Sequence, residues 1–226
     1  MNITALIPAR GGSKGIPNKN LKIFKGKTLV ERTIKQAIDS DYIQRVIVLT
    51  DDLEIAEISK NSGAEIPFIR PEYLANDISP IIETVIYTLE KLPDLEDIIL
   101  LQPTSPLRRV LDINNIIELR NIQKRHSAVS VCEISQNPEW MFRLQNNFMT
   151  NFLPQEKSSK RRQDLEKLYI LNGALYLSTR KHLLDNLNFV SKETLPYLME
   201  KKYSVDIDNE IDWKYAELIY DRIYDI

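Results

Sequence analysis

Short apolar runs alternate with amphipathic stretches along the first 132 residues, and this alternation restricts the chain to few folds. The apolar runs have the length of strands and are residues 3–7, 45–50, 66–69, 97–101 and 128–132. The stretches between them have apolar residues at helical spacing and are residues 29–38, 52–63, 80–92 and 112–123. Because strands that alternate with helices build a mostly parallel sheet covered on both faces, we predict an α/β fold.

Polar loops follow these predicted strands, at the places where a ligand would be held. They are residues 8–20, 50–52, 70–79 and 102–108. In open α/β sheets, ligands bind beyond the carboxyl ends of the strands. The loops are therefore expected to meet at one edge of the sheet and to form the site.

The alternation changes after Cys132. Residues 138–142 and 148–152 are expected to be short strands, within a lobe of irregular and β structure inserted at about 135–200. Residues 203–208 are expected to return to the sheet, and residues 210–224 to form a closing helix. We predict one domain over residues 1–226 that carries this inserted lobe.

The loop after the first strand, IPARGGSKGIPNKN at residues 7–20, is rich in glycine and cations. It opens a stretch in which six cations precede the first acid, Glu31, and which holds four of the six glycines of the chain. The pattern predicts an anion site, and the number of cations favours a polyphosphate over a monophosphate. A solvated basic loop is the alternative reading. Neither the Walker pattern nor the G-x-G-x-x-G dinucleotide pattern fits this stretch, since Leu21 and Ser13 stand where glycines are required.

Two carboxylates near the end of the chain, Asp206 and Asp208, alternate with apolar residues. Alternation in an extended segment points both carboxylates to one side, where they repel each other unless a cation compensates. Mg²⁺ suits such a pair together with phosphates. Acid-x-acid patterns also occur on ordinary surfaces, so the metal role depends on the basic loop lying close by.

Composition excludes several classes of protein. A net charge of -2 and a pI near 5.8 argue against a nucleic-acid binder. No run approaches the about 18 apolar residues of a membrane helix. The lone Cys132 lies in an apolar run and is expected to be buried, so we expect a cytoplasmic protein. His126 and His182 are expected at the surface.

Five motifs together resemble the acylneuraminate cytidylyltransferases, the CMP-sialic acid synthetases and their relatives that activate legionaminic and pseudaminic acids. The motifs are IPARGGSKGIPNKN at 7–20, LQPTSPLR at 101–108, RQDL at 162–165, NGALY at 172–176 and SVDID at 204–208. The resemblance implies a Rossmann-like nucleotidyltransferase fold. It also implies a reaction in which CTP and a nine-carbon 2-keto acid sugar give a CMP-sugar and pyrophosphate.

The resemblance further implies roles for individual residues. Catalysis would involve Arg10, Lys19 and Asp208. The nucleotide would be bound by Ala9, Arg10, Gly11, Gly12, Ser13, Lys14 and Lys19 at the phosphates, and by Asn20, Arg70 and Ser79 at the ribose and cytosine. The sugar would be bound by Gln102, Thr104, Ser105, Asn172 and Tyr176, with Arg162 pairing with its carboxylate. The metal ion Mg²⁺ would be held by Asp206 and Asp208.

The resemblance also implies a homodimer, formed through the inserted lobe, with aromatic residues of the partner reaching the sugar. The chain departs from the usual sialic-acid pattern at Glu139–Trp140 and at Asn188–Phe189. Both departures touch the sugar side, and we therefore predict a legionaminic-type or other modified nonulosonic acid. A glycosyltransferase with an acid-x-acid metal site and a non-catalytic nucleotide-sugar sensor are the alternatives.

Overall fold

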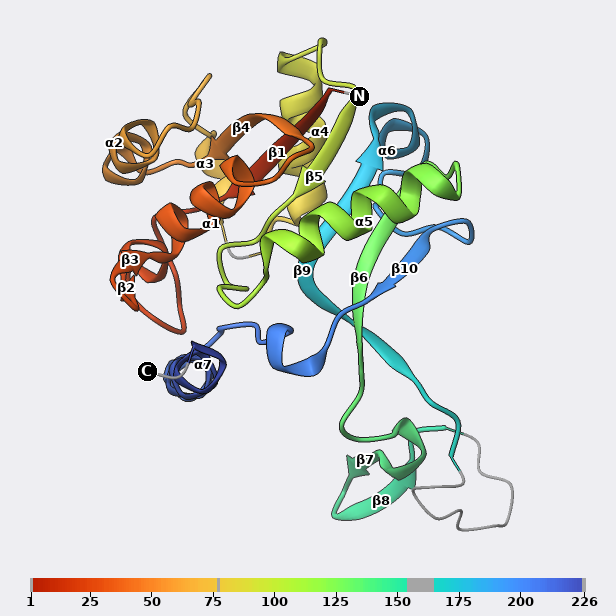
Figure 1. Cartoon of the computed structure of the whole chain (residues 1–226). Helices are drawn as coiled ribbons and strands as arrows, with labels where there is room; N and C mark the ends of the chain where they lie inside the picture. Colours follow the sequence, from red (N-terminus) through yellow and green to blue (C-terminus); the bar gives the residue numbers. More distant parts are fainter. Residues whose placement is uncertain (1, 77, 154–164, 225–226) are drawn as a thin grey trace.

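A computed structural model of the chain describes residues 2–76, 78–153 and 165–224. Its centre is a sheet with the strand order β10–β6–β9–β5–β1–β4 (Figure 1). Strand β9 is antiparallel to both of its neighbours, and the other pairings within this sheet are parallel. The mostly parallel sheet predicted from the sequence is confirmed.

The bounds of the elements follow the sequence pattern closely in the first half of the chain. The strands are β1 (Ile3–Pro8), β2 (Ile23–Phe24), β3 (Lys27–Thr28), β4 (Ile43–Leu49), β5 (Asp97–Leu100), β6 (Ser127–Glu133), β7 (Phe142–Gln145), β8 (Phe148–Asn151), β9 (Tyr169–Thr179) and β10 (Leu195–Leu198). The α-helices are α1 (Leu29–Ile38), α2 (Leu53–Asn61), α3 (Glu72–Ala75), α4 (Ile81–Lys91), α5 (Val110–Ile122), α6 (Arg180–Asn186) and α7 (Glu210–Tyr224).

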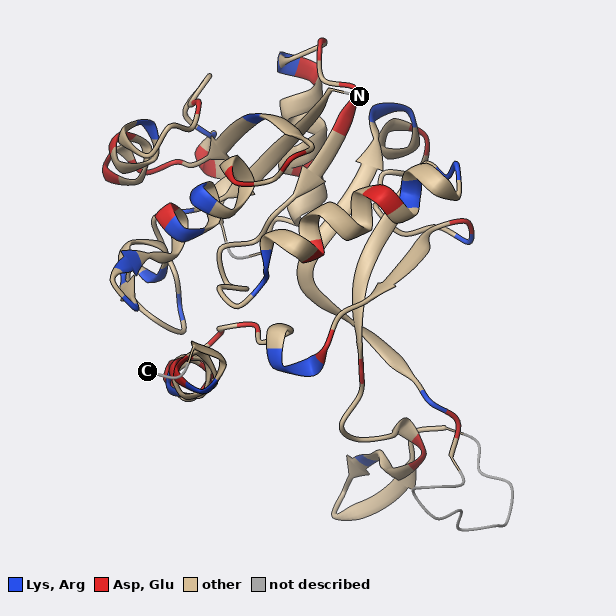
Figure 2. Ribbon diagram, in the orientation of Figure 1, with Lys and Arg blue, Asp and Glu red and all other residues tan. Residues whose placement is uncertain are grey.

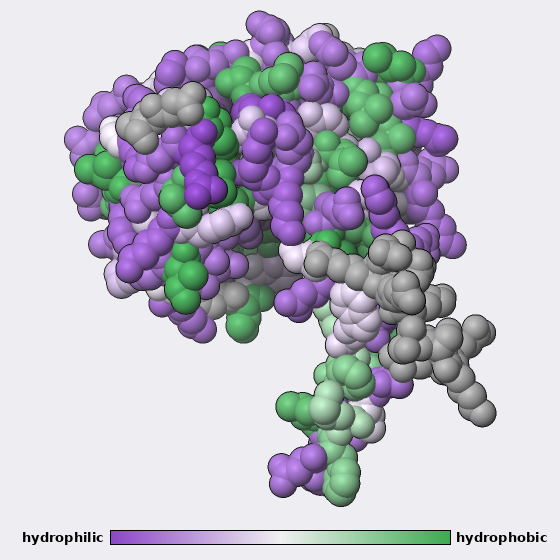
Figure 3. All heavy atoms as spheres, turned by 60° about the horizontal axis from the view of Figure 1, so that its bottom comes forward, coloured by the Kyte–Doolittle hydropathy of each residue, from purple (hydrophilic) through white to green (hydrophobic). Residues whose placement is uncertain are grey.

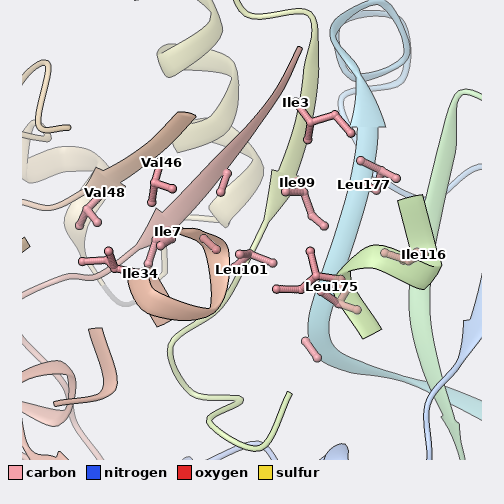
Figure 4. Packing of buried hydrophobic residues seen from close by; sticks show 14 of the residues in the cluster. Ile3, Ile7, Ile34, Val46, Val48, Ile99, Leu101, Ile116, Leu175 and Leu177 are labelled. Carbon is pink, nitrogen blue, oxygen red and sulfur yellow. The ribbon is translucent and has the colours of Figure 1, made fainter. Parts of the chain in front are cut away.

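Helices cover both faces of the sheet, because alternate residues of each strand point to opposite sides. On one face, Ile7, Ile99 and Leu175 pack with Ile34 of α1 and Ile116 of α5 (Figure 4). On the other face, neighbouring strand residues pack against α4 and α6. Burial of each such side chain stabilises the fold by about 1.5–3 kcal/mol, so the two layers hold the strand ends in fixed places.

Local signals define where the first two helices begin. The hydroxyl of Thr28 accepts a hydrogen bond from the Glu31 amide, and the Glu31 carboxylate accepts one in return from the Thr28 amide. Asp52 caps α2 by accepting from the amides of Glu54 and Ile55. Side chains that satisfy free amides in this way set the start of a helix.

Three predicted strands are wrong. Residues 138–142 are mostly a 3-10 helix, Pro138–Trp140, and strand β7 begins only at Phe142. Residues 66–69 form no strand, since Pro67 lacks an N–H, and only a bridge between Glu65 and Ile47 remains. Residues 203–208 do not rejoin the sheet: Tyr203 ends a short 3-10 helix, Lys201–Tyr203, and residues 204–208 run as an irregular segment toward α7.

A third apolar cluster fixes this C-terminal segment beside the opening loop. Val205 and Ile207 pack there with Ile16 of the loop, Phe24 of β2 and Trp213 of α7. Trp213 and Phe24 meet edge to face, with ring centroids 5.6 Å apart. The end of the chain is therefore attached to its beginning, as the position of α7 below β2 and β3 shows (Figure 1).

Part of the predicted inserted lobe belongs to the main sheet. Strand β9 lies between β5 and β6, and β10 forms the edge next to β6. The β7–β8 hairpin projects from the body as an arm (Figure 1). Among the described residues, no helix has the length and apolar character needed to cross a membrane.

Candidate active site

A cavity of about 310 Å³ opens at the carboxyl edge of the sheet. Segments far apart in the sequence meet around it: the opening loop, the loop before α4, the loop after β5 and the C-terminal segment. Of the predicted residues, those that line it are Arg10, Ser13, Lys19, Asn20, Arg70, Ser79, Gln102, Thr104, Asp206 and Asp208. The structure thus brings cations and carboxylates predicted from opposite ends of the chain into one cavity.

Lys19 joins the opening loop to the C-terminal segment. Its Nζ donates to the carbonyl of Ile207 at 2.6 Å and lies 3.5 Å from Oδ1 of Asp208. Gly15 makes the same approach possible, because a Cβ at this position would lie 1.9 Å from the carbonyl oxygen of Asp208. The loop and the acid pair are therefore in direct main-chain contact.

Some of the lysines in the opening stretch pair with acidic residues of α7 rather than facing the cavity. Lys22 pairs with Glu210 at 2.8 Å and Lys25 with Asp221 at 2.6 Å, so both lysines hold α7. In the ribbon of Figure 2, the positions of Lys and Arg residues, in blue, gather at this side of the molecule, around β2 and β3. Of these cations, Arg10 and Lys19 line the cavity. Lys22 and Lys25 were counted among the cations that favoured a polyphosphate, but they pair with α7 instead.

Asp206 and Asp208 share the cavity but differ in exposure. Burial raises the pKa of Asp206, and the nearby Asp208 carboxylate adds to this, while a hydrogen bond from Thr104 opposes it. The Oδ1 atom of Asp206 is buried without a hydrogen-bond partner. The Asp208 side chain is 77% exposed. The amide of Ile207 donates to the carbonyl of Thr104 at 2.8 Å and keeps both carboxylates at the edge of the loop that follows β5.

The residues predicted to contact the base and ribose, Asn20, Arg70 and Ser79, also line the cavity. The Asn20 amide donates to the carbonyl of Arg10 at 2.9 Å. Arg70 is buried, and burial lowers the pKa of its guanidinium, which Asp51 partly counteracts. The Ser79 hydroxyl donates to the carbonyl of Tyr73 at 2.7 Å.

Some predicted site residues do not line the cavity. The neighbours of Arg10 in the loop, Ala9, Gly11, Gly12 and Lys14, are absent from its lining, and Ala9 is a buried residue whose amide donates to Leu49. Arg162 lies outside the described residues.

Three predicted sugar contacts also lie outside the cavity lining. Ser105 is fully buried. The Asn172 side chain is buried and engaged internally: its Oδ1 accepts from Ser130 and its Nδ2 donates to Ser204. Tyr176 packs on Phe189 of the same chain, with centroids 5.5 Å apart, and burial raises its pKa.

Three residues that the sequence interpretation missed shape the site. The Asp51 carboxylate accepts from the Gly11 amide at 3.2 Å and from Arg70 at 3.3 Å, so it ties the opening loop to the base side. Arg108 belongs to the loop after β5, and its side chain is buried. Gly173 has a φ of 76°, and a Cβ there would lie 3.3 Å from Oδ2 of Asp206. Arg108 and Gly173 could have been identified from the sequence, because they belong to the motifs LQPTSPLR and NGALY.

The acid pair fits a divalent cation when phosphates supply further ligands. The described residues contain no group of three or more acidic, histidine or cysteine side chains suited to a metal ion. A pair of carboxylates, with one buried oxygen lacking any partner, is however the donor set that Mg²⁺ uses together with phosphate oxygens and water.

The fold and this cavity define a class. A mostly parallel sheet with a glycine-rich cationic loop after its first strand, facing an acid pair, is a nucleotide-binding α/β architecture. The family model for cytidylyltransferases matches residues 4–226, and the chain belongs to this family. It is a nucleotidyltransferase.

Curated relatives and solved structures agree with this assignment. The chain is 37% identical to the CMP-N,N'-diacetyllegionaminic acid synthase of Legionella pneumophila, over 96% of this chain and 95% of that protein. It is 33% identical to the N-acylneuraminate cytidylyltransferase of Escherichia coli, over 97% of this chain and 52% of that protein. A solved CMP:2-keto-3-deoxy-manno-octonic acid synthetase complexed with CTP shares the fold, with a TM-score of 0.73, 16% identity and coverage of 99% and 100%.

Proposed function

We propose that the chain transfers the cytidylyl group of CTP to a nonulosonic acid. The anomeric hydroxyl oxygen of the sugar forms a bond to the α-phosphorus, and the bond from this phosphorus to the bridging oxygen breaks. The products are the CMP-sugar and pyrophosphate, and the hydroxyl gives up its proton. The observation that carries this proposal is the meeting of Arg10 and Lys19 with Asp206 and Asp208 at one cavity in a cytidylyltransferase.

The residues of the cavity supply positioning and charge rather than covalent chemistry. Arg10, Lys19 and the Ser13 hydroxyl hold the triphosphate and stabilise negative charge on the departing pyrophosphate. Arg70 and Asn20 hold the base and ribose, and Gln102 with Thr104 orients the sugar. Asp206 and Asp208 would hold Mg²⁺, which neutralises phosphate charge when bound.

We further propose that the sugar is of the legionaminic type. The chain carries Glu139–Trp140 and Asn188–Phe189 at places that differ from the usual sialic-acid pattern. The Legionella relative, which matches along nearly its whole length, supports the same choice.

A panel of purified nonulosonic acids, each with CTP and Mg²⁺, tests both proposals in one assay. Mass spectrometry should detect a CMP-sugar, and pyrophosphate should appear in equal amount, with N,N'-diacetyllegionaminic acid preferred. Preference for N-acetylneuraminic acid would refute the sugar assignment alone. Release of free CMP or CDP from a nucleotide sugar, without pyrophosphate, would indicate a glycosyltransferase instead. CTP binding without turnover of any acid would indicate a sensor.

A homodimer joined through the arm is also part of the proposal. Leu144, Phe148 and Met149 of the hairpin are 77%, 74% and 62% exposed. Hydrophobic side chains gather along the projecting arm in Figure 3. Exposed apolar patches of this kind mark interfaces, so sedimentation should give a dimer, and Leu144→Glu with Phe148→Glu should give monomers. The cytoplasmic location remains a prediction from the sequence.

A further inference from the structure

Arg108 belongs to the loop that follows β5, and its side chain is buried. Arg108 is 1% exposed and has one of the largest fully buried side chains among the described residues. One terminal nitrogen, Nη1, donates to the carbonyls of Gln102 at 3.2 Å and Ala174 at 2.8 Å. The other, Nη2, donates to Oε1 of Gln36 on α1 at 3.0 Å. The guanidinium thus connects three segments of the chain.

The acceptors of this guanidinium are uncharged, which makes its burial costly. Removing a cation from water costs several kcal/mol unless close partners offset it, and carbonyl oxygens offset less than a carboxylate does. Burial lowers the pKa of Arg108 to about 9, with Asp112 opposing the change, so the side chain stays charged at neutral pH. An apolar side chain would fill the same space without this cost.

One of the backbone carbonyls that Arg108 holds belongs to Gln102, which lines the cavity together with Thr104 of the same loop. The other belongs to Ala174 of β9, a strand that contributes no residue to the cavity lining. Ala174 adjoins Gly173 on β9, where a Cβ would lie 3.2 Å from Oε1 of Gln102 and 3.3 Å from Oδ2 of Asp206. The position of the Gln102 amide relative to Asp206 therefore depends on the distance between these two backbone segments.

Gln36 completes the arrangement from the opposite side. Its Nε2 donates to the carbonyl of Arg108 at 2.5 Å and to that of Pro106 at 3.2 Å, while its Oε1 accepts from the guanidinium. Gln36 and Arg108 therefore hold each other through both backbone and side chain. Gln36 itself is outside the cavity lining, so any effect of changing it on the sugar must pass through Arg108 and its loop.

From this geometry we infer that Arg108 is a positioning residue for the sugar side of the site. It fixes the loop after β5 to β9, and so sets the place of Gln102 beside Asp206, while the nucleotide side is held independently by Asp51 and Arg70. The inference rests on the proposed function, which assigns Gln102 to the sugar.

Steady-state kinetics of Arg108→Lys tests this role. A lysine keeps the charge but cannot reach the three acceptors as the planar guanidinium does. The expected result is a fall of about tenfold or more in kcat/KM for the sugar, with KM for CTP changed by less than about twofold. Gln36→Leu should also lower kcat/KM for the sugar, by a smaller factor. This variant replaces Arg108→Lys as the test if the Arg108 variant fails to fold.

Arg120→Lys is the matched control. Arg120 is also buried, at 2% exposure, but its guanidinium pairs with Asp97 through two hydrogen bonds of 2.7 and 3.1 Å. This variant should lower Tm and leave KM for the sugar unchanged. An effect of Arg108→Lys on CTP and sugar alike, or on Tm only, would reduce Arg108 to a structural residue and overturn the inference.

Hydrogen–deuterium exchange separates failure of the inference from failure of the proposed function. Faster exchange is expected in Arg108→Lys for peptides covering residues 101–107 and 172–175, whether or not any sugar turns over. If the unmodified protein uses no nonulosonic acid, the proposed function fails. Hydrogen–deuterium exchange then tests by itself whether Arg108 holds the loop after β5 against β9. Unchanged exchange in these peptides would overturn the inference.

Discussion

Gly15→Ala offers the sharpest test of how the opening loop meets the acid pair. The added Cβ would stand 1.9 Å from the carbonyl oxygen of Asp208 and 3.1 Å from its carbonyl carbon. Ordinary contact begins near 3.4 Å, so the two backbones must separate by about 1.5 Å. The obstacle is main chain on both sides, and no side-chain rotation can relieve it.

Such a separation would change the relation of Lys19 to the acid pair. Lys19 reaches the Ile207 carbonyl at 2.6 Å and Asp208 at 3.5 Å, and both contacts lengthen when the loop moves away. A displacement of about 1 Å at reacting groups can cost about 10²-fold in rate, which corresponds to about 2.7 kcal/mol. We therefore expect kcat/KM of Gly15→Ala to fall by about 10²-fold or more.

Gly12→Ala is the matched control within the same loop. A Cβ there meets no atom of the protein within 4 Å, so the substitution should leave Tm unchanged, and any loss of kcat/KM should be smaller than that of Gly15→Ala. Both variants are compared by continuous pyrophosphate release with CTP, Mg²⁺ and the preferred acid, and by Tm. Equal activity of Gly15→Ala and the unmodified protein would refute the contact, and equal loss in both variants would attribute the effect to glycine flexibility instead.

Three further substitutions test separate parts of the site and fold. Asp208→Ala should abolish Mg²⁺-dependent turnover while Tm stays within a few degrees, because the side chain is 77% exposed; full activity would remove it from the metal site. Lys19→Ala should lower kcat by about 10²-fold through lost charge stabilisation, measured by the same pyrophosphate assay. Burial and the neighbouring His126 lower the pKa of His182 below 6.5, so the unfolded chain binds the proton more readily. The free energy of unfolding should therefore fall as pH drops through 6.5, and His182→Gln should flatten this dependence in thermal unfolding scans.

The first half of the fold could be predicted because its signals are local. The strands near residues 3–8, 43–49, 97–100 and 127–133 are apolar runs bounded by polar loops, and each lies close to its predicted place. Caps such as Thr28 and Asp52 belong to the helices they begin. A strand buried on both faces of a sheet appears in the sequence as a short, continuous apolar run, and its length and flanking polar loops identify it.

The second half shows where local signals fail. The segment of strand β9 was assigned to the inserted lobe, because its antiparallel place between β5 and β6 depends on partners about 40 to 80 residues away. The strand β10 (Leu195–Leu198) was missed because it is short and contains Pro196. His182 was expected at the surface, yet it is 8% exposed, since α6 packs against the sheet.

The acid pair shows how a wrong secondary structure can still give the right geometry. The segment around Asp206 forms no strand, yet Ile207 is fully buried in the third cluster while both neighbouring carboxylates line the cavity. Two hydrogen bonds to the main chain of Ile207 explain this: its amide donates to the Thr104 carbonyl, and its carbonyl accepts from the side-chain Nζ of Lys19. Side chains alternate along any extended backbone, whether or not it pairs with a neighbouring strand. The sequence pattern therefore predicted the direction of both carboxylates correctly, although the segment is not part of the sheet.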